Sequence, residues 1–371
     1  ELMNIVVIAE STPGPIAINC ATYVGYRRGG FWGAVVATLG IVLPSFCIIF
    51  AISLIATFAF GFNGLQAYNI VSAFEVYVGN LQESILPTVI GVILAVCALV
   101  IFFAGDIIGK ISSVLVPVMA GLYILIGVFV IITNITRIPA VLGIILADAF
   151  DFKAVFGGFT GSCMVLGIKR GLFSNEAGMG SAPNASASAD VSHPAKQGLV
   201  QMFSVFLDTL IICSATAFMC LCSGVAPSAD LAGAPYVQAS LQASFGDFGP
   251  IFIAVSMALF AFTTLIGNYY YCEGCLKFIL KRVPSQTFMS VFRGIAAVIV
   301  LLGAMLSMNL AWNTADLFQA LMVVINIPVI LILTKPAMAA LTDYMAQRKE
   351  GKDPQFKAAS IGLKEKTDFW N

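Results

Sequence analysis

Residues 171–183, which read GLFSNEAGMGSAP, combine small polar side chains with the two residue types that disturb a helix. Gly178 and Gly180 weaken helical structure, and Pro183 lacks a backbone donor. The flanking segments are apolar and long enough to cross a bilayer. Inside hydrocarbon, a freed backbone group is tolerated only where it is buried in protein or lines a cavity. The sequence therefore predicts a helix broken within the membrane, which is typical of ligand sites in transporters.

The side chains at this break have two open interpretations. Glu176, next to Asn175, could accept a hydrogen bond from the amine of a substrate. It could equally bond the freed backbone amides and serve only the architecture of the break. A helix N-terminus at the break would favour a carboxylate of the substrate.

A second carboxylate, Asp208, falls in the apolar run VFLDTLII. An ionisable group within a membrane span is costly and suggests a function. Asp208 could relay a proton or hold a cation, or it could only hydrogen-bond a neighbouring helix. The sequence leaves these alternatives open.

Three further polar residues are candidate ligands. Thr263 and Thr264 lie within an apolar span, and their hydroxyl oxygens suit a cation such as Na⁺. The same hydroxyls commonly bond the backbone of their own helix. Gln66, expected near the outer end of a span, carries an amide that can donate to and accept from the two ends of an amino acid, or can simply be solvated.

Other reactive residue types predict structural roles. His193 is the single histidine, and we interpret it as a polar residue at a helix start rather than a metal ligand. Cys272 and Cys275 form a CxxC without the second pair or thioredoxin-like context of a zinc or redox site. The tyrosines at 269–271 predict an interfacial belt rather than a ligand site. The net charge of +0 gives no indication of nucleic-acid binding.

The elements that must position these residues are membrane helices. Of the 371 residues, 59% are hydrophobic and 10% are charged, against about 25% charged in soluble domains, and the mean hydropathy is +0.96. This composition predicts an all-α polytopic membrane protein. Predicted spans are residues 31–58, 85–104, 112–133, 198–222, 250–280, 294–310 and 317–333. Residues 155–168 are too short to cross alone and need 172–189 as a second half, which gives a discontinuous helix at about 155–189.

Basic residues predict the orientation. Lys and Arg are absent from residues 57–84 and 223–249, so we expect these connections outside the cell. Lys169, Arg170 and Lys196 are assigned to the inner side, together with a lysine-rich tail. We therefore expect a multipass plasma-membrane protein with a cytoplasmic C-terminus, and a loosely ordered polar tail after Met345.

From about residue 58 to 343, the sequence resembles the alanine or glycine:cation symporter family. The resemblance is carried by residues 167–218, beginning GIKRGLFSNEAGMGSAP, by FTTLIGNYYYCE at 262–273 and by ADLFQALMVVINIP at 315–328. It implies a leucine-transporter type of fold with two inverted helix repeats. It also implies Na⁺-coupled, or H⁺-coupled, symport of alanine, glycine or a similar small neutral amino acid by alternating access, without covalent chemistry.

The resemblance also implies site residues. The unwound substrate helix corresponds to Phe173–Ser181, the cation site to Thr263 and Thr264, and a substrate-facing glutamine to Gln66. Asp208 is added as a candidate coupling residue. The substrate-binding set is Gln66, Phe173, Asn175, Glu176, Gly178, Met179, Gly180 and Ser181.

The first part of the chain departs from that family. Residues 2–57 contain AESTPGPIAINCATYVGY and GAVVATLGIVLPSF, which resemble chromate transporters. We therefore predict a chromate-transporter-like segment at 1–57, a symporter-like domain at 58–343 that lacks the family's first core helices, and a tail at 344–371. The alternatives are an oxyanion transporter, which would need cations at membrane depth, and a non-transporting fusion product.

Overall fold

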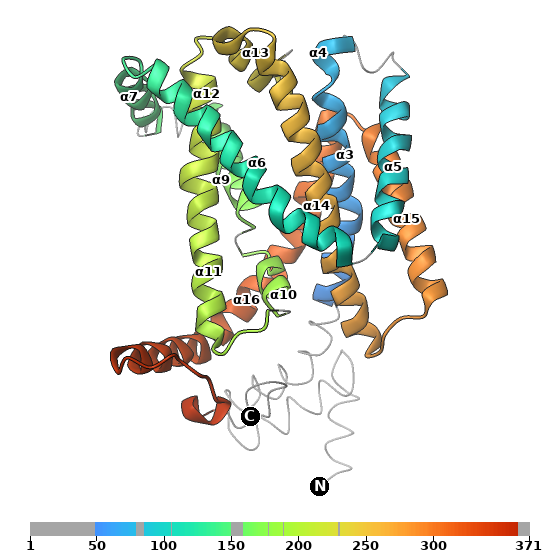
Figure 1. Cartoon of the computed structure of the whole chain (residues 1–371), viewed down its shortest axis with the longest axis vertical. Helices are drawn as coiled ribbons and strands as arrows, with labels where there is room; N and C mark the ends of the chain where they lie inside the picture. Colours follow the sequence, from blue (N-terminus) through green and yellow to red (C-terminus); the bar gives the residue numbers. More distant parts are fainter. Residues whose placement is uncertain are drawn as a thin grey trace, which may run out of the picture.

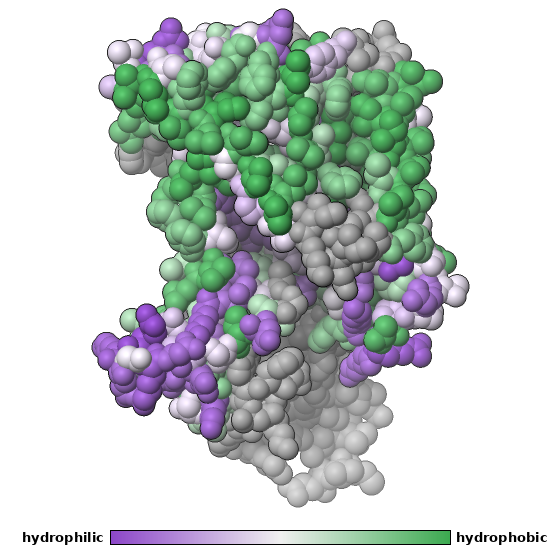
Figure 2. Space-filling model, viewed as in Figure 1, coloured by the Kyte–Doolittle hydropathy of each residue, from purple (hydrophilic) through white to green (hydrophobic). Residues whose placement is uncertain are grey.

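A computed structural model of the chain describes residues 49–78, 85–104, 106–149, 159–176, 178–187, 189–228 and 231–362. Within these ranges every regular element is a helix, and six helices are long and apolar enough to cross a membrane. The prediction of an all-α polytopic membrane protein is confirmed. Figure 2 shows the matching surface, on which apolar side chains cover the upper part of the visible face and hydrophilic ones gather at the lower end.

The elements follow one another along the chain as coloured in Figure 1. In order, they are η1 (Ala56–Phe62), α3 (Asn63–Ser72), α4 (Glu75–Val78), α5 (Leu86–Ala104), α6 (Asp106–Thr133), α7 (Ile138–Ala149), α9 (Phe159–Ser174), α10 (Ser181–Ser186), α11 (Pro194–Leu207), η3 (Asp208–Ile212), α12 (Cys213–Leu221), α13 (Ala234–Phe245), α14 (Phe248–Leu280), α15 (Gln286–Ala304), α16 (Met308–Lys349) and η5 (Ala358–Ile361). The helix α14 is central and contacts η1, α3, α5, α6, α10 and α13.

One span lies where the sequence predicts a connection. The helix Ile49–Tyr77 runs through η1 and α3 without interruption, whereas we expect a span to end at residue 58. Its polar residues are paired inside the bundle: the buried Asn268 amide donates to buried Asn63 over 2.8 Å. Because such pairing removes the cost of burying polar groups, a span can be less apolar than a hydropathy rule requires.

The same helix crosses residue 57, where we predict a boundary between two segments. Ala51 and Leu54 share a buried cluster with Phe58, Met179 and Met322. Residues 49–57 therefore pack into one core with the rest of the described bundle. The remainder of the segment 1–57 lies outside the described residues.

The discontinuous helix is present as predicted. The helix α9 ends at Ser174, and α10 begins at Ser181 below it in Figure 1. Between them, Glu176, Gly178 and Gly180 have φ angles of 52°, 76° and 85°. These left-handed conformations stop the helix, and glycine adopts them without steric cost.

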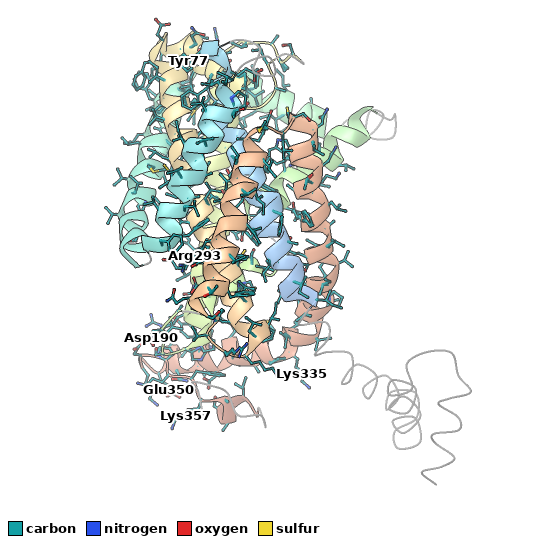
Figure 3. The ribbon with its side chains drawn as sticks, turned by 90° about the vertical axis from the view of Figure 1, so that its right-hand side faces the viewer. Tyr77, Asp190, Arg293, Lys335, Glu350 and Lys357 are labelled. Carbon is teal, nitrogen blue, oxygen red and sulfur yellow. The ribbon has the colours of Figure 1, made fainter. Side chains whose placement is uncertain are left out.

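The tail is more ordered than the sequence suggests. The helix α16 continues to Lys349, and the chain then returns so that the Phe356 amide donates to the Ser192 carbonyl over 2.9 Å. His193 is fully buried and contacts the rings of Tyr344 and Phe356 at steep angles. The prediction of a loosely ordered tail is wrong for residues 346–362, because aromatic residues in a polar sequence supply a small core. Figure 3 shows Lys335, Glu350 and Lys357 at the end opposite Tyr77.

Candidate substrate site at the broken helix

The geometry of the break depends on Gly180. A Cβ atom at this position would lie 2.5 Å from Phe50 Cζ and 2.7 Å from Asn326 Oδ1. Real Cβ atoms do not approach other atoms so closely, and the φ of 85° already disfavours any side chain. Gly178 also needs its positive φ, although no atom lies within 4 Å of a Cβ built there.

The side chain of Asn326, on α16, holds the break in place. We predict no role for this residue from the sequence. Its Nδ2 donates to the Gly178 carbonyl over 2.8 Å, and the residue is 8% exposed. Asn326 therefore satisfies a carbonyl that the break removes from helical bonding. The sequence does contain a signal for this role, because Asn326 is a polar residue within an apolar span. Such residues cost free energy in a membrane and usually face the protein interior.

Glu176 is part of the break's architecture. It accepts a hydrogen bond from the hydroxyl of Ser181, which is fully buried. The backbone also bonds locally, since the Met179 amide donates to the Glu176 carbonyl over 3.3 Å. These bonds support the architectural interpretation of Glu176, but its side chain also reaches a cavity.

This break cavity has a volume of about 410 Å³. Two carboxylates, Glu176 and Asp208, line it together with Tyr271. Among the residues that the structure describes, its lining consists of Ser174, Asn175, Glu176, Ala182, Gln201, Met202, Ser204, Val205, Asp208 and Tyr271. Figure 2 shows hydrophilic residues in a hollow below the apolar band. The cavity thus offers negative charge and hydroxyl, amide and phenol groups within a membrane protein.

A second cavity, which we term the upper cavity, has a volume of about 480 Å³. It is mostly apolar and aromatic, with Tyr68, Tyr123, Phe260 and Trp312 in its walls. Helix α13, which supplies residues such as Val237, lies at the top of Figure 1. Its other lining residues are Asn69, Ser72, Ser174, Ile212, Thr216, Gly233, Ala234, Ile253, Ser256, Met257 and Met308.

The sequence-predicted ligands are only partly brought together. Asn175, Glu176 and Asp208 line the break cavity. Met179 is fully buried in the hydrophobic core, and Phe173 packs against Phe62 and Trp312 with ring centroids 4.9 and 5.3 Å away. These two side chains therefore pack into the protein core next to the break and do not line the break cavity.

The remaining candidates lie outside both cavities. Thr263 and Thr264 each donate to the Phe260 carbonyl over 2.9 Å, which is the helix-backbone bonding that we weighed against cation binding. Gln66 is half-buried on α3 and is absent from either lining, while its helix neighbours Tyr68 and Asn69 line the upper cavity.

The sequence misses an ion pair beside the break. Arg170 Nη2 lies 2.5 and 2.6 Å from the two carboxylate oxygens of Asp316, and its guanidinium carbon lies 4.1 Å from the ring centroid of Trp312. Arg170 belongs to α9, which precedes the break, whereas Lys196, which we expect on the same side of the membrane, belongs to α11, which follows it. The pair with Asp316 explains how a cation is accommodated within this helix.

The structural interpretations of histidine and cysteine agree with the structure. His193 caps α11, because its Nδ1 accepts from the Ala195 amide over 3.1 Å. Cys272 and Cys275 are free, buried members of the core. Tyr271, expected in an interfacial belt, instead lines the break cavity. Among the described residues, no group of three or more His, Cys, Asp or Glu side chains could hold a metal ion.

A helix broken among membrane spans, beside a polar cavity, is the arrangement of secondary transporters, and this fold and site define a multispan protein of that class. Residues 25–358 match the sodium:alanine symporter family, and the chain belongs to this family. The match includes residues 25–57, which we set apart as chromate-transporter-like. The comparisons give no support to that resemblance or to a fusion.

Relatives of this chain are carriers by name. The amino-acid carrier protein AlsT of Bacillus subtilis is 45% identical over 319 residues, which are 85% of this chain and 66% of AlsT. The probable sodium/glutamine symporter GlnT of the same organism is 43% identical over 310 residues, 83% of this chain and 63% of GlnT. The sodium/proton-dependent alanine carrier protein of Bacillus sp. PS3 is 37% identical over 327 residues, 83% of this chain and 71% of that carrier. The chain thus spans about two thirds of the length of these relatives.

Proposed function

We propose that this chain is a secondary carrier that moves a small neutral amino acid, such as alanine or glycine, together with Na⁺ or H⁺ by alternating access. The observation that carries the proposal is the glycine-dependent break between α9 and α10, which opens onto a cavity containing Glu176 and Asp208. The names of its relatives, which include an alanine carrier coupled to sodium or protons, support the same substrate class.

Charge complementarity gives the proposed site its mechanism. The ammonium group of the amino acid lies against Glu176 or Asp208, which face the break cavity. The amino acid's carboxylate would be unfavourable beside these groups in a low-dielectric site, and a cation offsets it. Binding of the cation and of the substrate therefore favour each other, which is the physical basis of coupled transport.

Thr263 and Thr264 stay in this proposal as cation ligands. Each hydroxyl donates its proton to the Phe260 carbonyl, which leaves oxygen lone pairs able to accept a cation. The proposed role of Gln66 in facing the substrate requires a conformation in which α3 turns this side chain toward a cavity.

The proposal includes the orientation. Lys335, Arg348 and Lys349 lie in the C-terminal half of α16, and Figure 3 shows Lys335 at the end of the molecule opposite Tyr77. Basic residues favour the cytoplasmic side, so we infer a plasma-membrane carrier with a cytoplasmic tail at 344–371.

Uptake by proteoliposomes tests this function. Purified chain is reconstituted, and the uptake of labelled alanine is compared under an inward Na⁺ gradient, an inward proton gradient and no gradient. We expect one of the gradients to drive accumulation, with unlabelled glycine and glutamine as competitors that define the side-chain size tolerated. Absence of accumulation of alanine, glycine and glutamine under both gradients would contradict the proposal.

A further inference from the structure

Among the described residues, one lines both cavities. Ser174, the last residue of α9, lines both the break cavity and the upper cavity. The upper cavity also includes Ile212 and Thr216, while the break cavity includes Asp208. The chain segment 208–216 and the end of α9 thus lie between the two spaces.

Polar contacts join the end of α9 to the segment 208–213 between the two cavities. The Ser174 hydroxyl donates to Asp208 Oδ2 over 2.7 Å, and Asn175 Nδ2 donates to Thr209 Oγ1 over 3.3 Å. Ser174 Oγ also lies 3.4 Å from Cys213 Sγ. We term these five residues the clasp. It joins the break to the segment formed by η3 and the first residue of α12.

Both partners of the clasp are irregular segments. On one side, α9 stops where the backbone enters left-handed conformations. On the other side, Asp208 begins the π-helix η3, and π-helical turns inside α-helices are frequent at functional sites. Ser174 and Cys213 are exposed and are joined by hydrogen bonds rather than by apolar packing. Such contacts exchange with water when a cavity is wet, so the clasp can open without disrupting the core.

We propose that the clasp is the partition between the upper cavity and the break cavity, and that it opens and closes once in each transport cycle. The inference rests on the proposed function and extends it, because it names the residues whose separation connects the two sides. In this role Asp208 acts as the acceptor that holds the partition shut.

The short Ser174–Cys213 contact provides the test. In Ser174→Cys, two thiols would face each other across the clasp, and copper phenanthroline with oxygen would remove their two hydrogens to form a disulfide. Mass spectrometry of peptides measures the crosslink, and proteoliposome uptake is compared in the same sample after oxidation and after reduction. The matched control is Ser174→Cys with Cys213→Ser, treated with the same oxidant.

We expect the crosslink to form and to reduce uptake at least about tenfold, because it removes one of the conformations that alternating access requires. Reduction should restore the rate, and the control should not respond to oxidant. A crosslink that leaves uptake unchanged, or the failure of the crosslink to form, would overturn the proposal while leaving the proposed function intact.

A second variant tests the partition if the reduced Ser174→Cys protein takes up no amino acid. Asp208→Ala removes the acceptor of the clasp, so the cavities should connect, and the passive leak of Na⁺ from proteoliposomes should rise about tenfold without amino acid. A leak equal to that of the unmodified protein would reject the partition.

Discussion

Gly180 shows most clearly how one residue sets the geometry of the candidate site. Its α-hydrogen faces Phe50 and Asn326, and its φ of 85° lies in the region that side chains disfavour. The sequence predicts the break from residue types alone, because glycine and proline disturb a helix locally. It does not predict the contact with Asn326, since that contact joins two segments far apart in the chain.

The first prediction concerns Gly180→Ala. The new Cβ would press on Phe50 and Asn326 in a strained conformation, which we expect to cost about 1–3 kcal/mol and to displace the break. Alanine uptake should therefore fall sharply. Gly171→Ala, in the α9 helix with no atom within 4 Å of its Cβ, is the control and should retain uptake. Equal uptake by the two variants would refute the importance of the break geometry.

At the scale of elements, the packing of α3 on α15 decides where a span lies. Gly64 of α3 and Gly303 of α15 meet so closely that a Cβ on Gly303 would contact the Gly64 backbone, 2.6 Å from its carbonyl oxygen. Small residues allow membrane helices to approach each other in this way. The sequence assigns Asn63–Ser72 largely to an outer connection, because its asparagines and glutamine lower the local hydropathy.

The second prediction tests this helix contact. Gly303→Ala should force the two backbones apart and lower the stability of the bundle by about 1–3 kcal/mol. Gly294→Ala on the same helix, where a Cβ has no neighbour within 4 Å, should not destabilise it. Thermal unfolding of both variants in detergent measures the difference. Identical midpoints would show that α3 and α15 are farther apart than the structure has them.

Elements also show why only part of the site follows from sequence. The discontinuous helix and the intramembrane Asp208 have local signals, namely helix-breaking residues and a charge in an apolar run. The contacts within the clasp and the contact between Arg170 and Asp316 have no local signal, because each depends on which helices become neighbours. Thr263 and Thr264 illustrate the opposite case: their local signal is clear, but the structure shows both hydroxyls bonded to their own helix.

At the scale of the whole molecule, the docked tail joins the end of α16 to the start of α11. Lys196 pairs with Asp353 over 2.6 Å, and the Ser192 hydroxyl donates to the Pro354 carbonyl over 2.9 Å. Ser192 lies between α10 and α11, and Lys196 lies in the first turn of α11, so both follow the broken helix in the chain. The polar composition of the tail predicts loose order, because the burial of Phe356 beside His193 depends on a contact between segments far apart in the chain.

The third prediction concerns this docking. Phe356→Ala removes an aromatic ring that is 7% exposed and contacts His193, so residues 351–362 should detach more often. Cleavage by a glutamate-specific protease after the exposed Glu350 should become faster. Lys357→Ala, at an exposed neighbouring position, is the control. Indistinguishable cleavage rates in the two variants would mean that the ring does not hold the tail.

The most direct measurement of the central claim is hydrogen–deuterium exchange of the peptide that covers residues 171–187, with Na⁺ present and with alanine or without it. If the break holds the amino acid, the backbone amides around Asn175–Ser181 should exchange more slowly when alanine is bound, while peptides from α5 and α15 stay unchanged. Saturating alanine binding, measured independently, with no change in exchange at the break would contradict the account.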